Sequence, residues 1–215
     1  GDGTTVNRHI PTQIGTDNDW QIISTGGTHC LAIKTNGTLW AWGFNSSGQL
    51  GIGTSSNGST VPIQIGTDTS WQDIAVGGDF NVAKNANNIL FTWGINLFGQ
   101  LGDGTTNDKL VPTPVFDQIQ SVAAGNYHTL VTTTNGSLYA WGRNGDGQLG
   151  DGTQTERHSP TPVGTASNWQ IATGGNQHSM AIKTDGSISA FGFNGNGQLG
   201  IGNTTVFVTV PTAIN

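Results

Sequence analysis

The tetrapeptide Gly-Gln-Leu-Gly occurs four times in this chain, at intervals of 51, 48 and 50 residues. An aromatic-Gly pair precedes each copy, and a polar segment with a Val-Pro or Ser-Pro pair follows it. Repeats of about 20–50 residues are typical of propellers and solenoids, in which one small unit cannot bury its apolar face alone. The chain is therefore an array of four like units, with the tetrapeptides at Gly48–Gly51, Gly99–Gly102, Gly147–Gly150 and Gly197–Gly200.

Each unit contains four short segments with the composition of β-strands. Apolar residues alternate with small or polar ones, and Pro near the start of the last segment is typical of an edge strand, where a missing N–H breaks no ladder bond. No segment shows a sustained 3.6-residue apolar period, so we predict no helix. In the first unit the predicted strands are Trp20–Thr25, Cys30–Lys34, Thr38–Trp42 and a segment around Val61–Ile65.

Asn-Gly and Asp-Gly pairs separate the second and third predicted strands in three of the units. Asn36-Gly37 is the first such pair, and it predicts a type I′ hairpin turn, in which both central residues have positive φ. The second unit has Ala86-Asn87-Asn88 at this place, so we expect a looser turn there.

A four-stranded sheet of this size must stack on a neighbour, and radial stacking gives a β-propeller of antiparallel blades. Gly1–Thr5 matches Gly102–Thr106, so we predict that residues 1–14 are the outer strand of a preceding blade. This orphan strand is an exposed edge, which could pair with another blade or with a second copy of the chain. The four complete blades are then 15–65, 66–116, 117–164 and 165–215 of one propeller domain.

Composition excludes several classes of partner. Only 9% of the 215 residues are charged, the net charge is −6, and Lys and Arg are scattered singly, so no basic stripe for nucleic acid exists. No run of 18 apolar residues is present, so we predict no membrane insertion. Cys30 is the only cysteine, which excludes an intrachain disulfide. Low Lys and high Thr, Asn and Gly favour a secreted or surface protein of a bacterium, with the cytoplasm as the alternative.

The repeat resembles that of the regulator-of-chromosome-condensation family. The third unit carries the resemblance most closely, through Ala124–Leu130, Gly136, Trp141-Gly142, Asn144 and Gly147–Gly150. The resemblance covers almost the whole chain. It implies a propeller that is typically seven-bladed, no enzyme chemistry, and protein binding through loops on one face. Such members include a nucleotide exchange factor for a nuclear GTPase, ubiquitin-ligase accessory modules and a secreted inhibitor of β-lactamases.

The units depart from the family pattern at a few positions. The second unit has Asp79-Phe80-Asn81 where the family has its His, and Phe191 replaces the Trp in the fourth unit. When the units are aligned on their glycine pairs, the first two units have one residue fewer than the others between that pair and the histidine position. We expect these changes to shift individual loops and leave the fold intact.

Candidate metal and catalytic residues have simpler structural interpretations. His29, His128 and His178 share one repeat position, so symmetry places them too far apart for one ion. Asp103-Gly104 and Asp151-Gly152 follow two of the tetrapeptides, and Asn144–Asp151 faintly resembles a calcium loop. The spacing of that motif is absent, and Asx-turn chemistry explains these residues. No catalytic set and no phosphate-binding loop occurs in the sequence. We therefore predict no enzyme, no cofactor and no metal.

Positions that differ between units after each aromatic-Gly pair are the candidate partner-binding site. Apolar side chains there have no evident core role, and aromatic residues beside an Arg are typical of protein-binding hot spots. Packing onto the adjacent blade is the alternative interpretation. The predicted site residues are Phe44, Leu97, Phe98, Arg143, Asp146 and Phe193.

Three functions agree with this pattern. The first is a non-catalytic protein-binding scaffold, the second a carbohydrate or matrix adhesion module that uses the same aromatic loops, and the third an exchange-factor-like regulator of a small GTPase. Because one fold hosts many functions, the fold does not choose among them.

Overall fold

A computed structural model describes residues 1–214 as four four-stranded antiparallel sheets. No helix occurs in this described part, so none is long and apolar enough to cross a membrane. The all-β propeller architecture predicted from the repeat is confirmed. Blade one contains β1 (Trp20–Thr25), β2 (His29–Lys34), β3 (Leu39–Asn45) and β4 (Ser56–Gln64). Blade two contains β5 (Trp71–Val76), β6 (Phe80–Asn85), β7 (Leu90–Gly94) and β8 (Lys109–Phe116).

The other two blades repeat this order. Blade three contains β9 (Ile119–Ala124), β10 (His128–Thr133), β11 (Leu138–Gly142) and β12 (Arg157–Pro162). Blade four contains β13 (Trp169–Gly174), β14 (His178–Lys183), β15 (Ile188–Phe193) and β16 (Phe207–Ala213).

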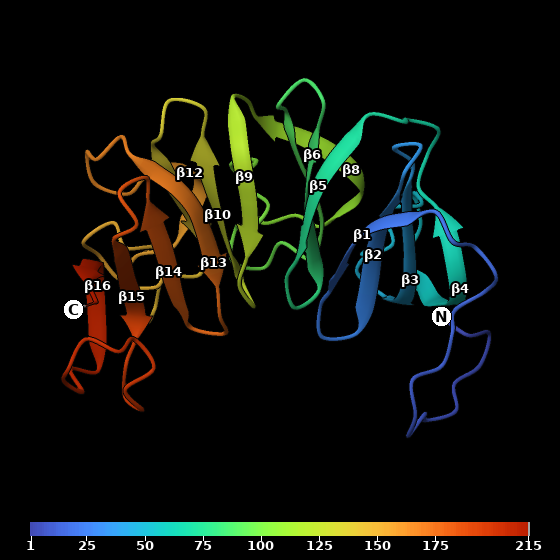
Figure 1. Cartoon of the computed structure of the whole chain (residues 1–215), viewed down its shortest axis with the longest axis horizontal. Helices are drawn as coiled ribbons and strands as arrows, with labels where there is room; N and C mark the ends of the chain where they lie inside the picture. Colours follow the sequence, from blue (N-terminus) through green and yellow to red (C-terminus); the bar gives the residue numbers. More distant parts are fainter. Residues whose placement is uncertain (215) are drawn as a thin grey trace.

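The blades stand side by side in chain order, from the N-terminus to the C-terminus (Figure 1). The first strands of successive blades contact one another, β1 with β5, β5 with β9 and β9 with β13. The first strand is therefore innermost, and the proline-bearing fourth strand is outermost.

The turn between the second and third strands is not the predicted type I′ turn. Asn36 has negative φ and only Gly37 is left-handed, at φ +78°. Gly37 N–H donates to the Lys34 carbonyl (2.8 Å) and Lys34 N–H to the Thr38 carbonyl (3.0 Å), so the loop has three residues. This is the type I turn followed by a left-handed residue, the next commonest hairpin.

The second unit does not have the looser turn that its sequence predicts. Asn88 takes the left-handed place of Gly37, with φ +58°. Its N–H donates to the Asn85 carbonyl (3.0 Å), as Gly37 N–H does in blade one. Asn replaces Gly here because its short polar side chain tolerates left-handed backbone better than most residues.

The hydrophobic core lies between blades. Leu50 of the first tetrapeptide packs in one buried cluster with Trp93 of blade two, Leu101 in a second with Trp141 of blade three, and Leu149 in a third with Phe191 of blade four. Each Leu belongs to the loop of one blade, and the aromatic residue belongs to the third strand of the next. The aromatic-Gly pair and the tetrapeptide are thus two halves of one interface.

Hydrogen bonds join the same two halves. The backbone carbonyl of Gln49 accepts from Trp93 Nε1 (3.1 Å) and from Asn81 Nδ2 (2.7 Å). The Gln100 carbonyl accepts from Trp141 Nε1 (3.0 Å) and Thr129 Oγ1 (2.8 Å). These groups are buried, and an unpaired polar group there costs about 1–3 kcal/mol. The glutamine carbonyl is therefore the polar joint between neighbouring blades.

The asparagine that precedes each tetrapeptide fixes its loop. Asn144 Oδ1 accepts from Leu149 N–H (3.0 Å), and its Nδ2 donates to carbonyls of Thr153 and Thr155. Equivalent bonds from Asn45, Asn96 and Asn194 hold the other three loops. The bond from the tetrapeptide leucine N–H to this asparagine thus holds the start of the loop in every unit.

The four units have equal length before the histidine position, contrary to the alignment on glycine pairs. Trp20 and His29 are nine residues apart, and so are Trp71 and Phe80. Phe80 pairs with Gly94 as His29 pairs with Gly43. The glycine pair itself is offset by one between units, because Asn126 and Asn176 stand where units one and two have Gly27 and Gly78.

Residues 1–14 form no strand in the described structure. A fourth strand needs a third strand beside it, and this segment has none to pair with. Gly3 N–H nevertheless donates to the Thr60 carbonyl (2.9 Å), as Gly104 N–H does to His158. Arg8 pairs with Asp2 (2.6 Å) as Arg157 pairs with Asp151 (2.7 Å). The segment thus has the local geometry of a loop that follows a tetrapeptide, and its place in a preceding blade stays a prediction.

We predict that Trp141→Phe lowers the free energy of unfolding by about 2–4 kcal/mol, because it removes a buried donor to Gln100 and leaves a cavity. The matched control is Trp40→Phe, since that half-buried indole donates only to Thr38 of its own blade. Its cost should stay below about 1 kcal/mol. Urea denaturation measures both, and equal losses in the two variants would contradict an interblade role for the indole.

Candidate functional site

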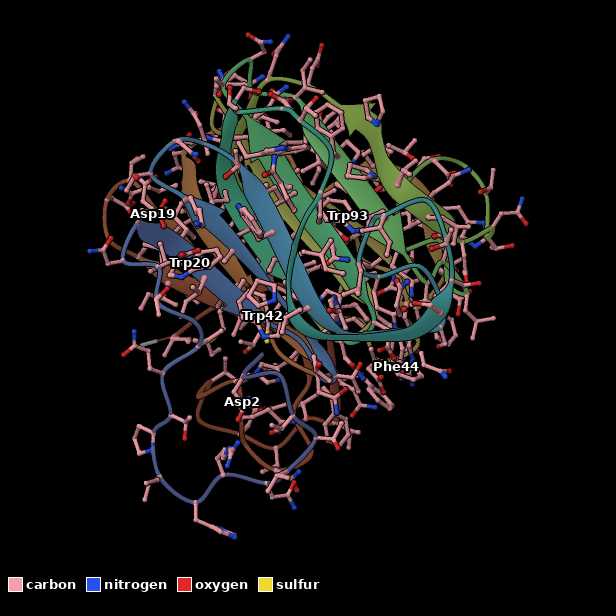
Figure 2. All side chains as sticks on the ribbon, turned by 90° about the vertical axis from the view of Figure 1, so that its right-hand side faces the viewer. Asp2, Asp19, Trp20, Trp42, Phe44 and Trp93 are labelled. Atoms are coloured by element: carbon pink, nitrogen blue, oxygen red, sulfur yellow. The ribbon has the colours of Figure 1, made fainter. Side chains whose placement is uncertain are left out.

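The loops after the aromatic-Gly pairs gather at one end of the blades, which we call the loop face. It is opposite the hairpin turns at Gly37 and its equivalents, and Figure 2 shows Phe44 and Asp19 at opposite ends of blade one. In each loop the glutamine side chain of the tetrapeptide accepts a backbone N–H two residues before it, as Gln100 Oε1 does from Phe98 (2.9 Å). The variable residues therefore stand on fixed backbone.

Three of the predicted site residues come together between blades two and three. The Arg143 guanidinium lies over the Phe98 ring, 5.9 Å from its centroid, and 3.3 Å from Asp146 Oδ2. The arginine and aspartate attract one another at this distance, but they are not aligned for a hydrogen bond. Tyr127 also contacts Phe98, with the two rings in an edge-on arrangement and their centroids 5.3 Å apart. We call Phe98, Tyr127, Arg143 and Asp146, with the adjacent Leu97, the loop cluster.

The loop cluster presents both apolar and charged surface. Leu97 is 63% exposed, the Arg143 side chain 30% and the Asp146 side chain 14%. Phe98 is only partly exposed, because it packs onto blade three. Packing on the adjacent blade, which the sequence left as an alternative, thus applies to Phe98 but not to Leu97.

Phe44 and Phe193 lie apart from the loop cluster. Phe44, at the end of β3, is 44% exposed. Phe193 packs against Phe207 of the outer strand of its own blade, with ring centroids 6.1 Å apart. The structure therefore divides the six predicted residues into one cluster and two separate aromatic positions.

Tyr127 is the site residue that sequence reasoning missed. It stands in the loop between β9 and β10, where the other units have Thr28, Asp79 and Gln177. An aromatic residue at a position that is polar in every other unit is the signal that could have identified it.

The repeated histidines join blades. His128 Nε2 lies 2.8 Å from Ser179 Oγ of blade four, and that hydroxyl donates to the Gln148 carbonyl (2.7 Å). Because the serine proton is used, we assign the imidazole proton to Nε2, which leaves Nδ1 buried without a partner. His29 makes the same contact with Asn81 Oδ1 at 2.8 Å.

Burial lowers the pKa of His128 to about 3, and the charges of His178 and Arg143 act in the same direction. Burial also lowers the pKa of His29 and of His178. Across residues 1–214 no three of His, Cys, Asp and Glu assemble into a ligand set for a metal. His29 and His128 therefore act as structural hydrogen-bonding groups between blades.

The aspartates that follow the tetrapeptides are paired with basic side chains and hydroxyls of the same blade. Asp151 pairs with Arg157 (2.7 Å) and accepts from Thr153, and Asp103 pairs with Lys109 (2.9 Å) and accepts from Thr105. Burial acts to raise the pKa of Asp151, but the hydrogen bonds from Thr153 and Arg157 outweigh it and lower that pKa. These carboxylates order the loop backbone.

The family model for the RCC1-like domain matches residues 1–215. The chain belongs to the RCC1-like domain family. Among solved structures it is similar to the crystal structure of Kap60 bound to yeast RCC1 (Prp20), with a TM-score of 0.81 and 25% identity over 94% of this chain and 50% of that chain. Human WBSCR16 gives a TM-score of 0.83 at 24% identity, over 94% of this chain and 54% of that one.

Relatives with similar sequences match smaller parts of the repeat. The Ultraviolet-B receptor UVR8 of Arabidopsis thaliana is 37% identical over 95 residues, which are 43% of this chain and 21% of the receptor. The probable E3 ubiquitin-protein ligase HERC4 of Homo sapiens is 34% identical over 107 residues, 48% of this chain and 10% of the ligase. The chain thus spans about half of the similar structures and 10–21% of these relatives.

We predict that acid destabilises the fold through His128. Above pH 6.5 the imidazole is neutral in the folded and the unfolded chain, but between pH 6.5 and about 3 only the unfolded chain binds the proton. The free energy of unfolding should therefore fall as pH is lowered from 6.5, by up to about 1.4 kcal/mol per pH unit for this residue.

The test is urea denaturation from pH 7 to pH 4 in wild type and in His128→Phe. Phe80 shows that phenylalanine fits this repeat position. The variant should have a smaller pH slope, and an unchanged slope would show that His128 is not the group responsible.

Proposed function

We propose that this chain is a non-catalytic propeller scaffold that binds a protein partner through the loop cluster. The observation that carries the proposal is the exposed Leu97 beside an arginine stacked on Phe98, on a loop whose backbone the repeat holds rigid. Aromatic and arginine side chains dominate binding energy at protein interfaces, and a rigid loop loses little entropy when it binds.

The RCC1-like relatives support a protein partner. One similar structure is a complex of yeast RCC1 with Kap60, and another is described by its binding to Gsp1p and histones. Those partners belong to those proteins. For this chain we infer only that a protein is the class of ligand. The setting we propose, the surface or surroundings of a bacterium, rests on composition, and the relatives named above are eukaryotic.

A library of random peptides displayed on phage tests the site. We expect selected binders to lose affinity on the order of tenfold or more for Leu97→Ser with Arg143→Gln, since hot-spot residues carry most of the binding energy. The matched control replaces Val61 and Val111, both 48% exposed on outer strands, with Ser. The thermal midpoint should change little in either variant. The proposed site would be refuted if the selected binders kept their affinity for the first variant, or if they lost as much affinity for the control variant.

Two other functions are distinguished by direct assays. Faster nucleotide release from a small GTPase would indicate exchange-factor activity, for which similarity to yeast RCC1 is the reason to test. Binding on a glycan array that depends on Phe44 would indicate carbohydrate adhesion, since that ring is 44% exposed.

Association through the end faces is a second proposal. A mostly apolar cavity of about 480 Å³ lies on the free face of blade one, lined by residues that include Trp20, Ile23 and Trp42. Blade four exposes Ile171 on its opposite free face, where Met180 also lies. At every interface within the chain, a blade face of the first kind packs against a face of the second kind. A second copy of the chain could therefore cover the two faces that are left at blades one and four. Residues 1–14 lie over part of the first face and would have to move.

Light scattering after size exclusion should then give twice the 22.3 kDa chain mass. Ile23→Glu should return the chain to a monomer, because it places a charge in an apolar interface. A wild-type monomer at high concentration would contradict self-association.

A further inference from the structure

The innermost strand of every blade carries a glutamine at its second position. All four side chains are exposed, each directly after a first residue that is buried or half-buried. The core therefore does not require glutamine here, and the loop face lies at the other end of the blades. The four residues are Gln21, Gln72, Gln120 and Gln170.

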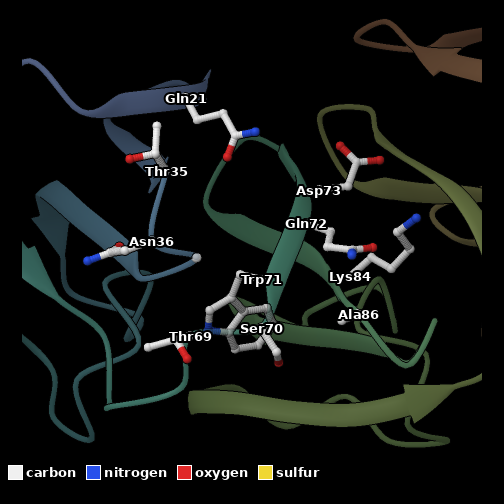
Figure 3. Close-up of a pocket in the computed structure, with 11 residues that line it drawn as sticks. Gln21, Thr35, Asn36, Thr69, Ser70, Trp71, Gln72, Asp73, Lys84 and Ala86 are labelled. Atoms are coloured by element: carbon white, nitrogen blue, oxygen red, sulfur yellow. The ribbon is translucent and has the colours of Figure 1, made fainter.

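Two of these glutamines line a groove between blades one and two. The groove has a volume of about 610 Å³, within the range of about 300–1,000 Å³ for ligand sites. Figure 3 shows Thr35 and Asn36 on one side of it, and Asp73 and Lys84 on the other. Its walls are therefore built mainly from amides, hydroxyls and one pair of opposite charges.

The two charged groups are already engaged. Lys84 Nζ donates to the backbone carbonyl of Gln120 (3.1 Å), and the Asp73 carboxylate accepts the N–H of Ile74 (2.9 Å). Burial also raises the pKa of Asp73, which disfavours its charge. The groove thus carries one ionisable group of each sign, and each already has a partner within the protein.

The groove also has little surface for stacking. Trp71 is the only aromatic residue among the described residues of the lining, and 7% of it is exposed. Sugar rings and nucleobases stack on exposed aromatic faces, which this groove lacks. The lining also presents the primary amides of Gln21 and Gln72, beside hydroxyls such as that of Thr35, and each amide can donate and accept at once.

A peptide unit is the ligand group that matches a primary amide, because its N–H and C=O satisfy the amide oxygen and nitrogen together. An extended chain presents such units at about 3.3 Å per residue, and main-chain hydrogen bonds of this kind supply affinity in peptide recognition. We propose that this groove binds an extended peptide segment with uncharged side chains, through Gln21 and Gln72. The site is separate from the loop cluster and does not depend on it.

The probe is a terminally blocked octapeptide of alternating Thr and Asn, titrated into ¹⁵N-labelled chain. The side-chain amide signals of Gln21 and Gln72 should shift saturably. The double variant Gln21→Ala with Gln72→Ala should bind about tenfold more weakly, as expected for the loss of two amide pairings. Both side chains are exposed, so the thermal midpoint should be unchanged, which separates lost binding from lost folding.

Two controls make the result specific. Gln154→Ala removes an exposed glutamine from the loop between β11 and β12 and should leave the titration unchanged. Maltopentaose, titrated in place of the peptide, should shift neither glutamine signal. Absence of a peptide-induced shift, equal affinity in the double variant, or a response to the sugar instead of the peptide would each overturn the proposal.

Discussion

The backbone carbonyl of the tetrapeptide glutamine is the point at which successive blades are joined. In blades one and two it accepts an indole N–H and a second side-chain donor of the next blade, as Gln100 does from Trp141 and Thr129. The adjoining leucine buries itself against the same indole. In blade three, where the next blade has Phe191, Gln148 accepts from Ser179 Oγ. Because a single blade cannot cover its own faces, the stability of each unit depends on this joint with its neighbour.

The same joint explains which residues the repeat keeps and which it varies. A Cβ on Gly102 would lie 2.5 Å from the Trp141 indole nitrogen, and the backbone there has φ +76°, so glycine is required at that contact. Blade two can have Phe80 in place of the histidine, because Thr129 of blade three reaches the Gln100 carbonyl without a hydrogen bond to that position. Positions outside the joint, such as Leu97 and Arg143, are free to differ between units. Differences between units are therefore one place where a binding surface can form.

The two proposed binding surfaces have different physical characters. The loop cluster is an irregular group of aromatic, apolar and charged side chains, formed where two blades meet. The groove at the other end depends on the glutamines that recur on the innermost strands. One surface thus arises from a departure from the repeat and the other from the repeat itself.

The sequence by itself determined the array of four units, the four strands of each blade and the need of the blades to stack on one another. It could do so because four copies of one pattern, such as the tetrapeptide at Gly99–Gly102, show the same local order of strand and turn residues four times. It also identified the loop positions, since those are where the copies disagree.

Only the tertiary structure decided how these positions come together. Tyr127 joins Phe98 and Arg143 because two blades converge there, whereas Phe193 packs on Phe207 and leaves the group. The turn at Gly37 has three residues and not two, and Asn88 adopts the same geometry without glycine. Contacts between blades and the hydrogen bonds of a turn depend on backbone placement in three dimensions, which a repeat pattern along one chain does not contain.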